Sequence, residues 1–210
     1  MSDNYQTLAF DSIEPEDAAS VAEQSIRWLI ANSYISEELS DCVYGSKDGL
    51  GHKPGGRWRE IVDEQEDQRL WNVWASRTGK PPPQASERLA DFLRLQINGV
   101  EASSKRSAHC SGENCEASVS GVCPACGVSS VPTSDLNELA EYWWNEGASR
   151  LQCPECSVSS SLQDWDWQPH WAFSEAALTF WNWPPISASA VTQLSEALNN
   201  IRIRQIVGRL

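Results

Sequence analysis

The sequence contains no long apolar run, only three histidines and one methionine, and fewer basic than acidic side chains. No apolar segment approaches the ~18–20 residues that span a bilayer, so we expect no membrane-spanning helix. The 210 residues include 16 Lys and Arg against 29 Asp and Glu, which gives a net charge of −13. Because binding to phosphate backbones depends on basic side chains, nucleic acid is not expected as a partner.

The first residues also lack the basic and then apolar pattern of a signal peptide. Met1–Asn4 is polar and acidic, and we therefore expect a cytoplasmic protein. In a reducing compartment, the seven cysteines are more naturally thiols or metal ligands than disulfides.

The scarcity of histidine leaves few candidates for acid–base catalysis. Cys42 can be paired on paper with His52 or His170, but no local nucleophile signature surrounds it. Cys42 is more simply interpreted as a small buried hydrophobic residue than as a nucleophile. We therefore expect no catalytic residues, and a protein that is not an enzyme is the simpler interpretation.

Four of the cysteines form two pairs with the spacing of a metal site. Cys123 and Cys126 enclose Pro-Ala, Cys153 and Cys156 enclose Pro-Glu, and 26 residues separate the pairs. Two thiolates three positions apart can share one tight turn, and two such turns supply four soft tetrahedral ligands. The paired Cys-Pro-x-Cys turns resemble a zinc ribbon, and this resemblance implies a structural Zn²⁺ held by the four cysteines rather than an activity.

A helix is expected between the two cysteine pairs. Asp135 and Glu138 form a capping pair, and the apolar positions recur at helical spacing as far as Gly147. The predicted apolar stripe consists of Leu136, Leu139, Ala140, Trp143 and Trp144.

A second metal site is the alternative use of the remaining cysteines. His109, Cys110 and Cys115 could form one, or replace one turn of the first, but they lack an obvious fourth ligand. A pair of free thiols is the simpler interpretation.

The pattern of the whole chain predicts an α+β protein. Residues 1–100 read as a mainly helical region, with helices over 15–32, up to about Arg77, and over 84–97. Residues 101–121 are rich in serine and predict a linker.

Residues 122–210 read as the zinc ribbon followed by a β-α-β segment. The aromatic run Ala176–Trp183 predicts a buried strand, Ser187 or Ser189 can cap a helix through Asn199, and Ile201–Val207 predicts a closing strand.

The eleven tryptophans suggest an interface, because Trp is enriched at binding hot spots. Trp165 and Trp167 alternate with Asp164 and Asp166 in a run without basic residues. An acidic rim with aromatic anchors would suit a basic protein partner, so we expect a non-catalytic binder of the inhibitor or immunity type.

Two other functions remain open. The loop over residues 49–59 could form a weak anion-binding nest from His52, Lys53, Arg57 and Arg59. With carboxylates from Asp164 or Asp166, that loop could belong to an enzyme. A nucleic-acid-associated ribbon would require the basic segments 52–59 and 202–209 to converge on one face.

Overall fold

The computed structural model describes most of the chain. The described residues are 3–11, 13–44, 49–111, 120–129, 133–147, 150–168 and 171–209. None of the helices within these ranges is both long and apolar enough to cross a membrane.

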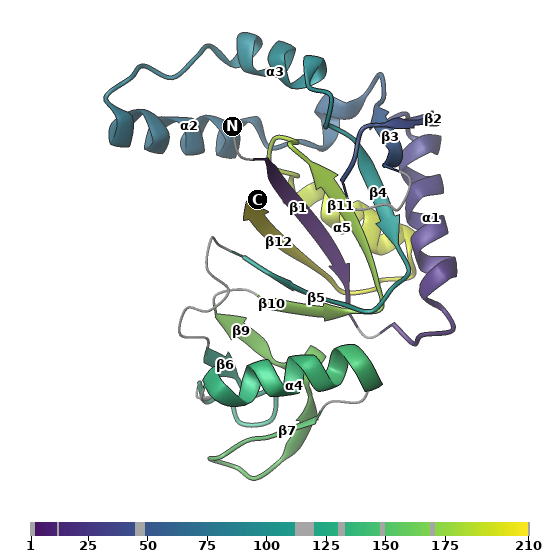
Figure 1. The fold of residues 1–210 in the computed structure, drawn as a ribbon, viewed down its shortest axis with the longest axis vertical. Helices are drawn as coiled ribbons and strands as arrows, with labels where there is room; N and C mark the ends of the chain where they lie inside the picture. Colours follow the sequence, from purple (N-terminus) through teal and green to yellow (C-terminus); the bar gives the residue numbers. More distant parts are fainter. Residues whose placement is uncertain are drawn as a thin grey trace.

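A six-stranded antiparallel sheet forms the centre of the molecule (Figure 1). Its strand order is β12-β1-β11-β4-β3-β2, so the first strand lies between the last two. The strands are β1 (Asn4–Phe10), β2 (Ile35–Asp41), β3 (Leu50–Pro54), β4 (Val100–Ser103), β11 (Ala176–Trp181) and β12 (Ile203–Arg209).

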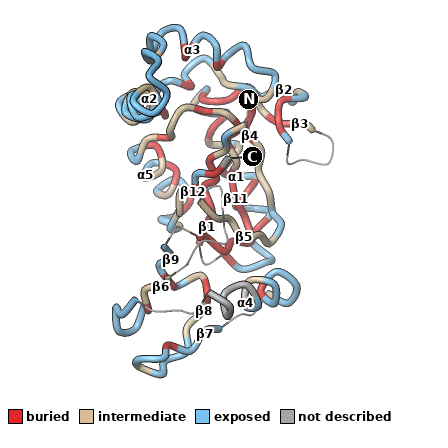
Figure 2. Tube along the Cα trace, turned by 60° about the vertical axis from the view of Figure 1, so that its left-hand side comes forward, coloured by how far each residue is buried: buried red, intermediate tan, exposed pale blue. Residues whose placement is uncertain are grey.

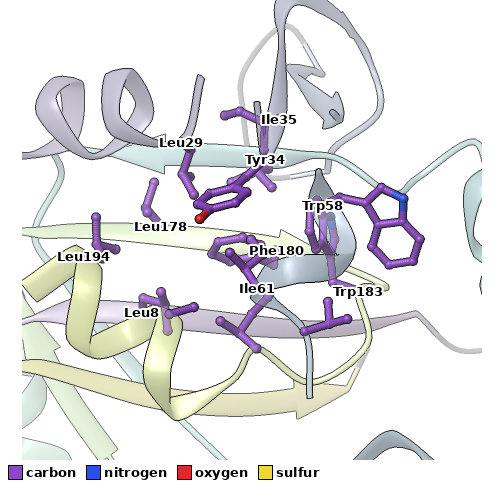
Figure 3. Packing of buried hydrophobic residues seen from close by; sticks show 14 of the residues in the cluster. Leu8, Leu29, Tyr34, Ile35, Trp58, Ile61, Leu178, Phe180, Trp183 and Leu194 are labelled. Atoms are coloured by element: carbon purple, nitrogen blue, oxygen red, sulfur yellow. The ribbon is translucent and has the colours of Figure 1, made fainter. Parts of the chain in front are cut away.

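Two helices cover one face of this sheet and build the main core. They are α1 (Ala18–Ala31) and α5 (Ala188–Ala197), the latter capped by the Ser187 hydroxyl, which accepts from the Ala190 N–H. Alternate residues of the strands point into the core, as period-two burial requires. The labelled core residues in Figure 3 come from both helices, from β1, β2 and β11, from the 3-10 helix over residues 58–61, and from loops: Leu8, Leu29, Tyr34, Ile35, Trp58, Ile61, Leu178, Phe180, Trp183 and Leu194.

The opposite face carries a two-stranded ribbon made of β5 (Ser107–Cys110) and β10 (Trp171–Ser174). Ala172 packs with Ala9 of β1 and Ile206 of β12, whereas Trp171 and Phe173 pack into a second core below. The ribbon therefore joins the sheet to the cysteine-bearing part of the chain.

That cysteine-bearing part lies beyond the ribbon, at the lower end of Figure 1. A short helix of the 3-10 type, η2 (Leu162–Asp164), precedes its last strand. The remaining elements are β6 (Ser120–Val122), α4 (Thr133–Glu146), β7 (Arg150–Gln152), β8 (Ser159–Ser161) and β9 (Asp166–Gln168).

A helical arm projects from the other end. It consists of α2 (Glu64–Thr78) and α3 (Ala85–Arg94), reached from the sheet through the 3-10 helix η1 (Trp58–Ile61). Figure 2 shows much of this arm as exposed, although Arg88, Leu89 and Phe92 of α3 are buried.

The α+β class, the helices and the strands β11 and β12 agree with the sequence prediction. The N-terminal region was expected to be mainly helical, but it also contains β1, β2 and β3. The stretch 101–121, predicted as a linker, instead begins with β4 and β5, which pair with β11 and β10. Residues 112–119 lie outside the described ranges.

Candidate metal centre

The two cysteine turns follow the same backbone path. Cys123 N–H donates to Val128 O at 2.9 Å, and Gly127 N–H donates to Cys123 O at 2.9 Å. In the second turn, Cys153 N–H donates to Val158 O, and Ser157 N–H donates to Cys153 O, at the same distances. Gly127 and Ser157 both have positive φ, at 72° and 60°. The two segments are therefore equivalent hairpin turns that present their cysteines alike.

The four sulfurs converge on one point. Their Sγ atoms all lie within 4.8 Å of one another, with 3.9 Å between Cys123 and Cys156 and 3.7 Å between Cys126 and Cys153. The sequence prediction that these four residues form one site is thus supported by geometry, and the site can hold a metal ion.

The centre is buried on one side only. Cys123 and Cys153 are buried, Cys156 is half-buried and Cys126 is exposed. Backbone N–H groups stabilise the thiolate form of Cys153: hydrogen bonds from the amides of Cys156 and Glu155 contribute to lowering the pKa of that thiol to about 7. Thiolates, rather than thiols, are the metal-binding form of cysteine.

An aromatic core packs against the buried side of the cysteine centre. Trp143, Trp165, Trp167 and Phe173 pack with Cys123 and Cys153, and the Trp165 and Trp167 rings stack at 5.7 Å. A Cβ on Gly121 would lie 2.6 Å from the Trp167 ring and 3.0 Å from the Trp165 ring, so only glycine fits there.

The burial of Trp165 and Trp167 corrects the predicted partner-binding surface. Both side chains are fully buried, so they cannot contact a partner, whereas Asp164 and Asp166 are exposed. The alternation expected for this segment is present on β9, but the indoles face the core. Asp166 also lies 3.6 Å from Arg204.

Helix α4 places aromatic and acidic side chains together on the surface. Trp143 is buried against Phe173, with ring centroids 5.5 Å apart. Tyr142 and Trp144 are 53% and 55% exposed, and Glu141 is exposed beside them. Shallow hollows of about 270 Å³ and 310 Å³ adjoin these side chains. Their lining is Ala108, Glu138, Ala140, Glu141, Tyr142, Trp144, Asn145 and Glu146.

Trp144 was predicted to lie in the buried stripe of this helix, and that assignment is wrong. Successive helical residues are rotated by about 100°, so Trp143 and Trp144 cannot both face the core squarely. One pattern in the sequence does indicate an exposed aromatic surface here. It is the run Tyr142-Trp143-Trp144, which lies between Glu141 and Glu146. Asp135, Leu136 and Leu139 have side chains outside the described set.

The basic loop does not form an anion-binding nest. Arg57 pairs with Glu60, and Arg59 pairs with Glu64 at 2.7 Å. His52 Nδ1 lies 2.9 Å from the carbonyl oxygen of Ser36, and Lys53 points to solvent. Residues 50–54 of this loop form β3, and Asp166 belongs to β9. The two strands lie at opposite ends of the molecule (Figures 1 and 2). The four cations are therefore not assembled with Asp164 and Asp166.

The second predicted metal site gains no support. Cys110 is disulfide-bonded, so its prediction as a free thiol is wrong, and Cys115 and His170 lie outside the described residues. His109 Nε2 is buried and, within the described part of the chain, has no hydrogen-bond partner. Burial lowers the pKa of His109 to about 4.

Cys42 is a buried hydrophobic residue beside Val43 and Trp181, as expected.

Comparison with protein-family models, with curated proteins and with solved structures finds no match to this chain.

Proposed function

We propose that the metal is Zn²⁺ and that its role is structural. A tetrahedral zinc with Zn–S bonds of about 2.3 Å places its sulfurs about 3.8 Å apart, which is close to the 3.7 and 3.9 Å separations. Four cysteine ligands leave no open position for a substrate or a reactive water.

The function of the protein is then to bind another protein, through α4. The observation that carries this proposal is the contrast between Trp143, buried against the metal-bearing core, and Trp144, exposed beside Tyr142 and Glu141. Exposed aromatic side chains supply contact area, and the surrounding carboxylates favour a basic partner. An inhibitor or immunity-type role toward a basic protein fits this surface.

The two alternatives have less support. An enzyme built on residues 49–59 would need that loop near Asp164 or Asp166, and the loop cations are already paired with Glu60 and Glu64. A nucleic-acid-binding face would need free cations, whereas Arg202 and Arg204 both pair with Asp11.

Metal analysis of the purified chain tests the first part. We expect about one zinc per chain, released when Cys126 and Cys156 are both changed to Ser. Metal content well below stoichiometric, with folding unaffected by a chelator, would contradict the zinc centre.

A capture experiment tests the second part. The immobilised protein should retain a basic protein from its own cell extract, and Tyr142→Ala with Trp144→Ala should abolish retention. Leu39→Ala is the matched control, because Leu39 is an equally exposed apolar residue on the distant strand β2. If the α4 double variant retains the same protein as the control, α4 is not the binding surface.

A further inference from the structure

Helix α2 has no buried residue, and the structure describes all 15 of its residues. Leu70, Val73 and Trp74 expose 45%, 37% and 39% of their surface. Helices of about 12–15 residues are marginal in water unless an apolar face is packed. These three side chains thus leave apolar surface of α2 available for a partner.

The helix is nevertheless held in a defined position. Asp63 caps its first turn by accepting hydrogen bonds from the Gln65 and Glu66 amides, and Gly79 ends it at a φ of 70°. On the side facing α3, the buried Arg88 pairs with Asp67 at 2.7 Å and lies over the Trp71 ring. These contacts fix α2 on α3. The exposed stripe, formed by Leu70, Val73 and Trp74, stays available on the rest of the helix surface.

The exposed stripe has a charge order along the helix. Positions 66, 70, 73 and 77 are separated by four, three and four residues, so Glu66, Leu70, Val73 and Arg77 lie along one face. Glu64 adds an acid at the same end as Glu66, and Lys80 follows Arg77 just beyond the other end. The face is acidic at its start, apolar in the middle and basic at its end.

Such a face is complementary to itself when two copies run antiparallel. We propose that α2 is the contact between two copies of this chain, related by a two-fold axis that passes near Val73. A two-fold interface joins the same patch of both chains, so the two apolar centres meet and each acidic end faces the partner's basic end. Antiparallel helix dipoles add to the attraction.

The balanced charge of the helical arm also favours a second copy as the partner, over an acidic or a basic protein of another kind. Residues 64–95 contain five acidic and five basic side chains, whereas the whole chain carries −13. Two arms can therefore meet without the repulsion that two acidic surfaces would suffer. Glu64 and Glu66 pair with the exposed Arg59 and Arg69, and such surface pairs exchange at little cost.

Sedimentation equilibrium of the full chain, with zinc present, tests the proposal. The wild-type mass should rise from one chain to two with concentration. Leu70→Glu with Trp74→Glu should weaken the dimer at least about a hundredfold, because it places unpaired charges in the contact. Leu39→Glu changes an exposed apolar residue outside the arm and should leave the dimer intact.

Charge reversal separates self-pairing from a general loss of solubility or folding. A chain with Arg77→Glu and Lys80→Glu, and a chain with Glu64→Lys and Glu66→Lys, should each be monomeric alone. Mixed together they should form a heterodimer, because every acidic end again faces a basic one. A wild-type chain that stays monomeric up to about 100 µM overturns the proposal, as does a mixture of the two reversed chains that does not associate.

Discussion

Gly127 and Ser157 hold the same place in the two cysteine turns, one residue after the second cysteine, and both adopt the left-handed backbone region. A side chain costs free energy in this region, and glycine does not bear that cost. We expect Ser157→Gly to raise the free energy of unfolding by about 0.5–1 kcal/mol, and Gly127→Ser to lower it by a similar amount. Chemical denaturation of the metal-loaded variants measures both changes, and equal stability of all three proteins would contradict the left-handed backbone at these two positions.

Gly121 controls the packing of the stacked tryptophans. The Cβ of Gly121→Ala would lie 2.6 and 2.8 Å from Trp167 ring atoms, so the rings must shift. We expect a loss of about 1–3 kcal/mol in stability and a changed near-ultraviolet circular dichroism spectrum. Gly56→Ala is the control, because its Cβ would meet nothing within 4 Å. An unchanged spectrum for Gly121→Ala would mean that the stack is not tight.

Arg204 connects the sheet to the cysteine-bearing part of the chain. Its Nε donates to the buried Asp11 carboxylate at 2.7 Å, and its guanidinium also donates to Gln163 O at 3.1 Å. Burial raises the pKa of Asp11, although the charges of Arg204 and Arg202 act in the opposite direction. Removing Arg204 therefore leaves a buried carboxyl group with less compensation.

We expect Arg204→Ala to cost about 3 kcal/mol of stability. Arg202→Ala, at a more exposed partner of the same carboxylate, should cost about 1 kcal/mol. Thermal unfolding of both variants compares them directly. Equal losses would show that the more buried of the two arginines is not the more important one.

His109 makes the stability depend on pH. Its pKa is about 4 in the folded chain, below the value of about 6.5 in an unfolded one. Between these values the unfolded chain binds more protons, so protonation favours unfolding. The contribution is fully present above about pH 6.5 and is lost as the pH falls to about 4.

The variant His109→Gln removes this titration but keeps a polar side chain. Between pH 7 and pH 5 the wild type should lose about 2 kcal/mol more stability than the variant. Denaturant titrations at the two pH values give both differences. Identical pH profiles would show that His109 does not titrate in a buried site.

Local patterns in the sequence were sufficient to predict several elements and the four cysteines of the candidate metal site. The three-and-four spacing of Ala18, Val21, Ala22 and Leu29 predicts α1, and the paired Cys-Pro-x-Cys turns predict the metal centre. These features depend on residues that are close in the chain. Strand β2 has no such signal, because it lies at the edge of the sheet and most of its side chains are exposed.

The surface of the site could not be predicted in the same way. Alternation in residues 164–167 correctly separates the carboxylates from the indoles, but it does not tell which side faces the core. That depends on β6, β10 and α4, which supply Gly121, Phe173 and Trp143. The linker prediction for 101–121 is wrong over residues 101–110 for the same reason, since β4 pairs with residues some 75 positions later.

The position of β1 has a consequence for the synthesis of the chain. Its residues pair on one side with 176–181 and on the other with 203–209, which follow it by more than 160 positions. During synthesis β1 therefore has to remain without these partners until the residues of β11 and β12 have been made. Closing such long loops slows folding. We expect the sheet to form only after β12 has been made, whereas the four cysteines lie within 34 residues of one another and can come together earlier.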